Sequence, residues 1–288
     1  MPTRLELPFV APYERERALD LLAAHAVPGA EIVDRSTLSV TRLLRAPSGP
    51  IAVTARLGVD SVTATASSTE PADLAAVETA VRFWLDLDRD PMSIVDAFGA
   101  DPLLGPMVSA RPGLRVVGHL DGYEAAITTV LGQQVSLASA RTFAGRLVAA
   151  YGTPGPAGLV SFPSAEALAG IPADELQRTV GLSGSRTATV LAVARACADG
   201  LALHPGVDLA ATRAALLAIP GVGPWTADYL AARALGDRDA YPAGDLVLRR
   251  ALGVRTAREA ESLAAPWRPL RAYALFHIWT AAVFSGPA

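Results

Sequence analysis

The chain has 288 residues, which is long enough for two domains with a substantial core. Its formal net charge of −3 at pH 7 argues against a strong nonspecific polyanion binder, because such proteins are usually basic overall. Hydrophobic residues make up 51% of the chain, yet no apolar run approaches the roughly 18–20 residues of a membrane-spanning helix. The first residues lack the layout of a signal peptide. We therefore expect a cytoplasmic protein that does not enter a membrane.

Cysteine and lysine usage excludes several kinds of chemistry. Cys197 is the only cysteine, so the chain has no intrachain disulfide, no thiolate zinc site and no four-cysteine iron–sulfur cluster. All 25 basic residues are arginines, and a side-chain amine for a Schiff base is therefore absent. The four histidines are scattered without the spacing of metal ligands, which argues against a metalloenzyme.

The first 90 residues have the pattern of an α+β domain. Helical apolar spacing covers 13–26, and another helix is expected over 71–85. Alternation and β-branched residues predict four strands between these helices, at 31–33, 38–44, 51–57 and 61–66. We expect a small antiparallel sheet with helices on one face, in a domain with a structural role.

From residue 91 to residue 288 almost every segment has helical character. We expect a helical domain of two lobes with a cleft between them. Residues 91–121 and 240–288 would form one lobe, and residues 122–239 the other. The second lobe would contain a helix-hairpin-helix over 209–235.

The turn at Pro220–Gly223 is the most informative short segment. Glycine permits positive φ and close backbone approach, and Pro224 suits the first turn of the next helix. Such a turn directs several N–H groups and a helix N-terminus at one point, where a phosphate oxygen is stabilised. Asp245 follows after a second turn. Alone it would be an N-cap for the helix beginning at Leu246. Together with the hairpin and an aromatic helix, it indicates a functional acid.

These residues resemble a known family. Leu-x-x-Ile-Pro-Gly-Val-Gly-x-x-Thr-Ala is similar to the hairpin of the helix-hairpin-helix DNA glycosylase superfamily, and Asp245 stands where that family has its catalytic aspartate. Within the superfamily the chain resembles the 3-methyladenine DNA glycosylase II branch. The similar stretches run through most of the chain, at residues 12–13, 22–27, 110–115, 131–136, 266–268 and 273–279.

The resemblance implies roles for particular residues. The base pocket would be formed by Trp225, Tyr229, Tyr273, Trp279 and Leu21. The DNA-binding residues would be Gly221, Val222, Gly223, Thr226, Gln133, Gln134, Ser136 and Arg249. Three positions need comment. Trp225 stands where glycosylase-lyases have their lysine. Gln134 stands where the family usually has an apolar wedge, the side chain that fills the space left by the flipped-out base. Leu21 stands where the family often has an aromatic residue.

The chemistry agrees with this assignment. Hydrolysis of an N-glycosidic bond develops positive charge on the sugar, which the Asp245 carboxylate would stabilise. A general acid is not evident, since His277 lies between apolar neighbours and is better explained as a core residue. N3- or N7-alkylated purines are cationic and leave as neutral molecules, so they need no acid. A cationic base also favours aromatic walls through cation–π attraction. Tyr273 fits a pocket and a plain core equally well.

The sequence therefore predicts a monofunctional DNA glycosylase that acts as a monomer on damaged double-stranded DNA of the nucleoid. No organic cofactor is expected. A Na⁺ or K⁺ ion at the backbone carbonyls of Leu217, Ile219 and Val222 would bridge to phosphate. Two alternatives remain open at this stage. One is a glycosylase for deaminated or oxidised bases, and the other is a noncatalytic helix-hairpin-helix DNA-binding protein.

Overall fold

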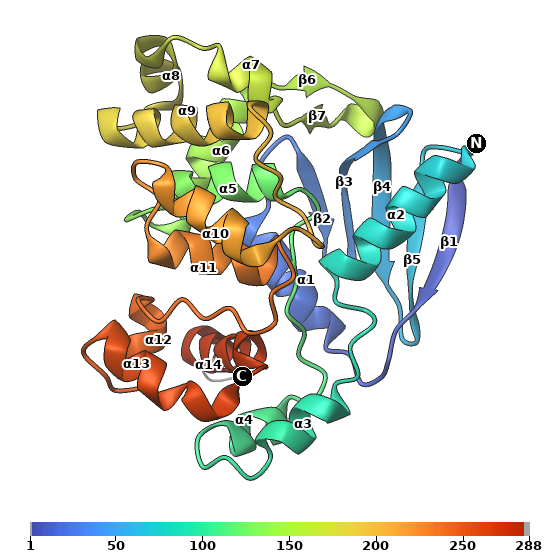
Figure 1. The fold of residues 1–288 in the computed structure, drawn as a ribbon. Coiled ribbons are helices and arrows are strands. Elements are labelled where there is room, and N and C mark those ends of the chain that lie inside the picture. The colour runs from blue at the N-terminus through green and yellow to red at the C-terminus, as the bar shows by residue number, and fades with distance from the viewer. Residues whose placement is uncertain (1, 285–288) are drawn as a thin grey trace.

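The computed structural model describes residues 2–284, and it has a β-sheet part followed by a helical part (Figure 1). The strands of the sheet are β1 (Thr3–Pro8), β2 (Glu31–Asp34), β3 (Ser39–Ala46), β4 (Gly49–Leu57) and β5 (Ser61–Ala66). All pair antiparallel, in the order β1-β5-β4-β3-β2. Strand β1 was not predicted. It is an edge strand in which only Leu7 is buried, so its sequence lacks a clear apolar face.

Two helices, α1 (Arg15–His25) and α2 (Pro71–Trp84), cover one face of the sheet. Leu19 of α1 and Val81 of α2 share one apolar core with Val40 and Val53 of the central strands. Burying such side chains contributes about 1.5–3 kcal/mol each, so this face holds the helices in place. The predicted fold class, an antiparallel sheet with helices on one face followed by helices, is confirmed.

The rest of the chain is mainly helical. Its longer helices are α5 (Gly122–Leu131), α6 (Leu137–Tyr151), α8 (Ala173–Val180), α9 (Gly184–Ala198), α10 (Leu209–Ala218), α11 (Pro224–Arg233) and α14 (Arg271–Phe284). Shorter helices are α3 (Met92–Phe98), α4 (Leu104–Ala110), α7 (Ala165–Ala169), α12 (Leu246–Ala251) and α13 (Ala257–Leu263). A two-stranded hairpin, β6 (Thr153–Pro154) and β7 (Val160–Ser161), and two 3₁₀ turns, η1 (Pro156–Gly158) and η2 (Ala265–Trp267), complete the fold.

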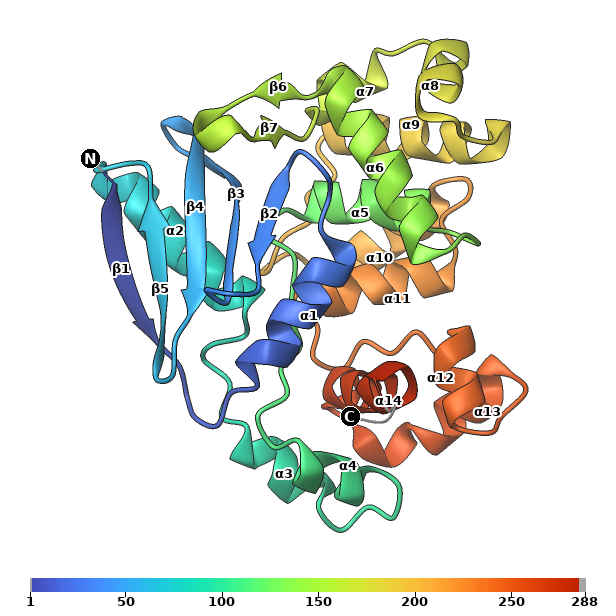
Figure 2. The same cartoon turned by 180° about the vertical axis from the view of Figure 1, so that it is seen from behind.

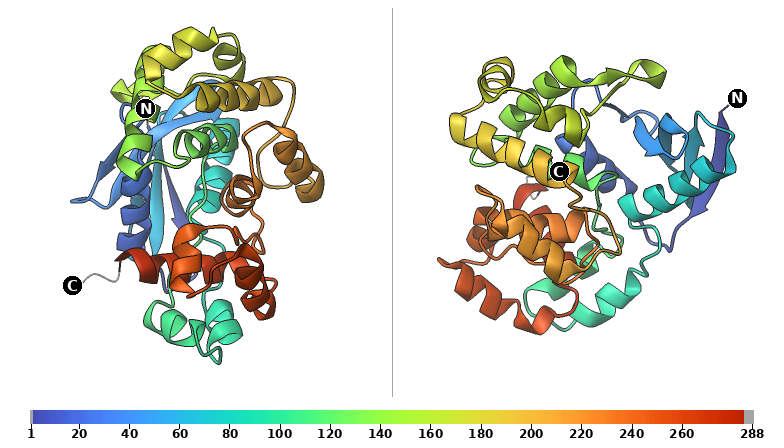
Figure 3. Two further views of the ribbon diagram at one scale, coloured as in Figure 1. Left: turned by 90° about the vertical axis from the view of Figure 1, so that its left-hand side faces the viewer. Right: turned by 45° about the horizontal axis from the view of Figure 1, so that its top comes forward.

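The helices form two groups. Helices α5 to α11 lie together, and α12 to α14 form a second group on the other side of the 237–245 segment (Figure 2). Helices α3 and α4 belong with the second group, because α4 packs against α14, and both views of Figure 3 show them side by side. Helix α1 connects the two parts of the molecule, since Leu21 packs against the sheet core and the helical core.

No helix among residues 2–284 is long and apolar enough to cross a membrane.

Candidate active site

The predicted hairpin connects α10 to α11. Gly221 has a φ of 89°, and a Cβ there would lie 2.0 Å from Oγ1 of Thr189 on α9. The fold itself therefore requires glycine at 221. Gly223 is different, because its φ of −98° is an ordinary extended value and a Cβ would meet no described atom within 4 Å. Its backbone faces open space immediately before the N-terminus of α11.

The Asp245 carboxylate caps α12 and also binds two indole side chains. As the N-cap of α12, its Oδ1 accepts the Leu248 N–H at 2.7 Å. The indole N–H groups of Trp225 and Trp279 donate to the same carboxylate, at 2.8 Å to Oδ2 and 3.0 Å to Oδ1. These are neutral donors from α11 and α14, so they fix the direction of the carboxylate without cancelling its charge.

The same indoles continue into an aromatic cluster. The rings of Trp225 and Tyr229 stack with centroids 5.3 Å apart and an interplanar angle of 21°. Trp279 lies 6.2 Å from Tyr229 and 5.6 Å from Phe276, centroid to centroid. The buried Arg233 donates to the Tyr229 hydroxyl at 2.7 Å and fixes that ring. The cluster therefore presents aromatic faces beside a carboxylate.

A cavity of about 390 Å³ opens between α1, α11, α12 and α14. Asp245, Tyr229, Trp279 and Leu21 line it, as the resemblance implied. Trp225 does not line this cavity. It lines a second cavity of about 390 Å³ that lies along α5 and α6. Tyr229 and His25 line both cavities, so the two cavities are adjacent and share these side chains as part of their walls.

Two predicted site residues lie elsewhere. Tyr273 is 1% exposed, donates to Oδ2 of Asp86 at 2.8 Å and lines neither cavity. It precedes Trp279 by almost two helical turns and packs under the segment after α2, so it is a core residue. Thr226 is 3% exposed, and its hydroxyl accepts the Gln133 side chain, so it supports the hairpin from within.

The loop between α5 and α6 lies against the hairpin. The Gln133 amide donates to the Gly221 carbonyl and to Thr226 Oγ1, both at 3.1 Å. The neighbouring Gln134 is exposed, and its φ of 54° lies in the left-handed region. Ser136 serves as the N-cap of α6. One side chain therefore joins the predicted wedge loop to the predicted phosphate-binding turn.

The remaining predicted positions have structural partners. Nη1 of Arg249 donates to the Arg255 carbonyl at 2.5 Å, which holds the turn after α12. Val222 is 6% exposed and its N–H donates to the Ile219 carbonyl at 3.0 Å. His277 is 3% exposed, and burial lowers its pKa to about 4. A neutral, buried imidazole agrees with a core role for His277.

Sequence reasoning missed part of the cavity wall. Leu137 and Val247 are 45% and 39% exposed and line both cavities, which makes an apolar rim. Helix α1 lines the cavity with the side chains of residues 17, 18, 21, 24 and 25. Arg115 and Arg233 also line it. Leu21 was expected in the pocket, but the i, i+4, i+8 spacing of Arg17, Leu21 and His25 was not used to extend that expectation along the helix. Among residues 2–284 there is no cluster of three or more His, Cys, Asp or Glu side chains for a metal.

Comparisons with known proteins agree with this geometry. Residues 4–121 match the AlkA N-terminal domain, and residues 127–261 match the HhH-GPD superfamily base excision DNA repair protein family. These matches define the class, a helix-hairpin-helix base excision repair protein with an added N-terminal sheet. The first match ends at residue 121 and the second begins at residue 127.

Individual relatives narrow the class. A probable bifunctional transcriptional activator/DNA repair enzyme AlkA of Mycobacterium tuberculosis is 43% identical over 96% of this chain, which spans 56% of that relative's length. A DNA-3-methyladenine glycosylase of Bacillus subtilis is 30% identical, with 68% of this chain and 69% of the relative covered. The 3-methyladenine DNA-glycosylase from Archaeoglobus fulgidus has the same fold, with a TM-score of 0.81 at 20% identity over 99% and 100% of the two chains. The chain belongs to the DNA-3-methyladenine glycosylase family.

Proposed function

We propose that the protein is a monofunctional DNA glycosylase that releases alkylated bases such as 3-methyladenine and 7-methylguanine from double-stranded DNA. One observation carries the proposal. The Asp245 carboxylate is held by two indole N–H groups at the wall of an aromatic cavity. The cavity volume of about 390 Å³ lies within the roughly 300–1,000 Å³ range typical of ligand sites.

The carboxylate acts on the sugar. As the bond to the base breaks, positive charge develops on the deoxyribose, and Asp245 stabilises it. At about 4 Å and an effective dielectric near 20, this attraction is on the order of 4 kcal/mol. That corresponds to roughly a thousandfold in rate. The hydrogen bonds from Trp225 and Trp279 keep the carboxylate directed at one place before the substrate arrives.

The aromatic cluster acts on the base. A base must leave the duplex to reach the cavity, at a cost of a few kcal/mol. There the rings of Tyr229 and Trp279 face it, and an alkylated, cationic base gains cation–π attraction that a normal base lacks. Because such a base leaves as a neutral molecule, the reaction needs no general acid. The buried, neutral His277 is consistent with this.

The hairpin and the loop beside it hold the DNA. The open space at Gly223 lets a phosphate approach the N–H groups at the start of α11. Gln134 is exposed at the tip of its loop and enters the vacated base stack as a wedge. A Na⁺ or K⁺ ion at the turn is part of this proposal. Among residues 2–284 the Ile219 oxygen accepts the Val222 N–H and no other backbone hydrogen bond, which leaves a second lone pair for an ion. Leu217 and Val222 carbonyls would complete its ligands.

The product is an intact abasic site. The sequence has no lysine, and Trp225, which fills the position that a lyase lysine would need, is committed to Asp245. The protein works as a monomer in the cytoplasm, on the DNA of the nucleoid.

Base release from duplex oligonucleotides, each with one defined lesion, tests the proposal. We expect release from the 3-methyladenine and 7-methylguanine duplexes and an uncleaved abasic strand. Asp245→Asn is the control for contaminating activity. Release of only deaminated or oxidised bases would replace the proposed lesion class. Binding to all duplexes without release of any base would mean a noncatalytic DNA-binding protein.

A further inference from the structure

His25 ends helix α1 and lines the cavity beside Asp245, which we call the base cavity. It has no role in the proposed hydrolysis. It lies on the same stripe of α1 as Arg17 and Leu21, which also line the cavity. Its Nδ1 is 2.9 Å from the Leu21 carbonyl oxygen, one turn earlier in the helix. This contact fixes the plane of the ring and the direction in which its other nitrogen points.

The contact also fixes the tautomer. A carbonyl oxygen only accepts hydrogen bonds, so Nδ1 of His25 carries the proton and donates it. Burial, and after it the positive charge of Arg233, lower the pKa of His25 to about 4. The ring is therefore neutral at neutral pH, and Nε2 keeps its lone pair.

That lone pair has no partner among the described residues. The His25 side chain is half-buried, and Nδ1 makes its one hydrogen bond among the described residues, to the Leu21 carbonyl. The other polar side chains that line the cavity include the arginines 17, 115 and 233, which only donate. The Asp245 carboxylate accepts three hydrogen bonds already. His25 therefore brings to the wall of the cavity a neutral ring whose Nε2 makes no hydrogen bond among residues 2–284.

We propose that His25 is a specificity-determining residue, whose Nε2 accepts a hydrogen bond from the exocyclic amino group of the extruded base. The proposal rests on the proposed glycosylase function. Alkylation of a ring nitrogen makes the base cationic and its amino hydrogens stronger donors, and hydrogen bonds with one charged partner are roughly twice as strong as neutral ones. An acceptor on the wall of the cavity thus favours amino-bearing, alkylated bases over other flipped bases.

A matched pair of lesions tests this acceptor. 3-Methyladenine and 3-methylpurine are both cationic when attached to DNA and differ only in the amino group. Single-turnover excision of each would be measured with the wild type and with His25→Leu, which keeps apolar bulk but removes the acceptor. Rates are divided by the spontaneous release rate of each lesion. For His25→Leu we expect a roughly ten- to hundredfold loss on 3-methyladenine, the range for a hydrogen bond to a charged group, and little change on 3-methylpurine.

Two further variants complete the experiment. His25→Gln presents an amide oxygen to the cavity and should recover part of the loss on 3-methyladenine, which a role in packing alone would not predict. His204→Leu is the matched control, because His204 makes the same kind of Nδ1 contact, 2.8 Å to the Pro205 carbonyl, on an exposed loop outside both cavities. Its rates should equal those of the wild type. Thermal unfolding and affinity for duplex with an abasic-site analogue check that each variant is folded.

Equal losses on both lesions in a folded His25→Leu variant, or no loss on either, would overturn the proposal. If His25→Leu does not fold, His25→Gln decides, and an equal loss on both lesions in that variant rejects the amino-group contact. Failure of the proposed function looks different, because the wild type itself would then release neither lesion.

Discussion

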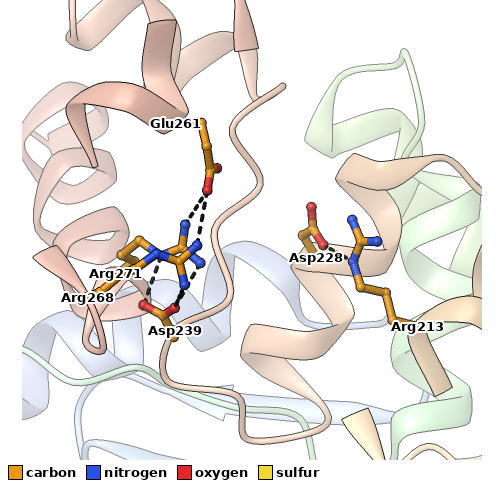
Figure 4. A network of polar contacts seen from close by, with 6 residues as sticks. All are labelled: Arg213, Asp228, Asp239, Glu261, Arg268 and Arg271. Atoms are coloured by element: carbon orange, nitrogen blue, oxygen red, sulfur yellow. Dashed lines mark hydrogen bonds and ion pairs between the residues drawn. The ribbon is translucent and has the colours of Figure 1, made fainter. Parts of the chain in front are cut away.

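Two cavities on different sides of helix α11 differ in the partners of their acidic side chains. The groove on the other side of the helix has a volume of about 540 Å³, against 390 Å³ for the base cavity. Three of its four acids, Asp228, Asp239 and Glu261, pair with arginines. Arg213 donates to Asp228 at 2.7 Å, and Arg271 donates to Asp239 at 2.8 Å (Figure 4). Arg268 and Glu261 extend the same network.

Asp245 is held in the opposite way. Its partners are two indoles and a backbone N–H, and within residues 2–284 no ion pair joins it to an arginine. A carboxylate fixed by neutral donors keeps its negative charge available, whereas Asp239 has its charge neutralised by neighbours. The two cavities therefore differ less in size than in the kind of donor around each acid.

The strongest test of this contrast compares two substitutions of the same chemistry. Asp245→Asn should lower single-turnover base excision by roughly 10²–10⁴, because the charge that stabilises the transition state is lost. DNA affinity should remain. Asp239→Asn should leave the excision rate of the folded protein unchanged and lower the thermal midpoint, since it removes the negative charge that Arg271 binds there and leaves Glu261 as the remaining acidic partner of Arg271. Wild-type turnover in Asp245→Asn would remove the catalytic assignment.

A smaller effect is expected from the donors. Trp279→Phe keeps an aromatic ring but removes the N–H that binds Asp245, and we expect a roughly ten- to hundredfold loss in excision rate. Trp267→Phe is the matched control, because its indole donates to the Asp101 carboxylate at 2.8 Å away from the cavity. That variant should lose stability and keep its rate. Equal rate losses in the two variants would show that the indole bonds act only through the fold.

The wedge contributes less again. Gln134→Ala should slow excision by roughly three- to tenfold opposite a normal base, with a smaller loss where the lesion is already mispaired, because less pairing energy then has to be overcome. Single-turnover rates on matched and mismatched duplexes measure this. Gln177→Ala, at another exposed glutamine on α8, is the control. The same loss in both contexts would point to another residue as the wedge.

The last prediction concerns stability and pH, and in it the excision rate is not measured. The folded-state pKa of His25, about 4, lies below the ordinary value of 6.5, so unfolded chains bind the proton first as the pH falls. Wild type should lose roughly 1–3 kcal/mol of unfolding free energy relative to His25→Leu between pH 6.5 and 4. Denaturant unfolding of both proteins across this range measures the difference. Other buried groups are common to both and cancel. A difference that is constant with pH would contradict the neutral ring.

The sequence was informative where chemistry is local. The turn at 220–223 and the acid at 245 were both found from residue types and spacing, since glycine, proline and a capping aspartate have strong conformational preferences of their own. The fold class followed from periodicity. The roles assigned to Gly223 and Gln134 remain predictions, although both lie where DNA can reach them.

Long-range packing was the part that residue patterns could not show. Tyr273 and Trp279 lie on one helix, and only the position of Asp86 after α2 makes the former a core residue. Thr226 is turned inward by Gln133, which is far away in sequence. From helix α1 only Leu21 was expected in the pocket, yet Arg17, Ala18, Ala24 and His25 line the cavity with it. These facts depend on how distant segments meet.

Gly223 has a consequence for the unfolded chain. Its backbone conformation is open to any residue, and a Cβ there would meet no described atom within 4 Å. Where glycine is not required, alanine stabilises a protein by about 0.4–1 kcal/mol, because it leaves the denatured ensemble fewer conformations. The free protein thus gives up stability at a position where the fold would accept alanine. Glycine at 221 gives up no stability in this way, since Thr189 leaves no room for a larger residue there.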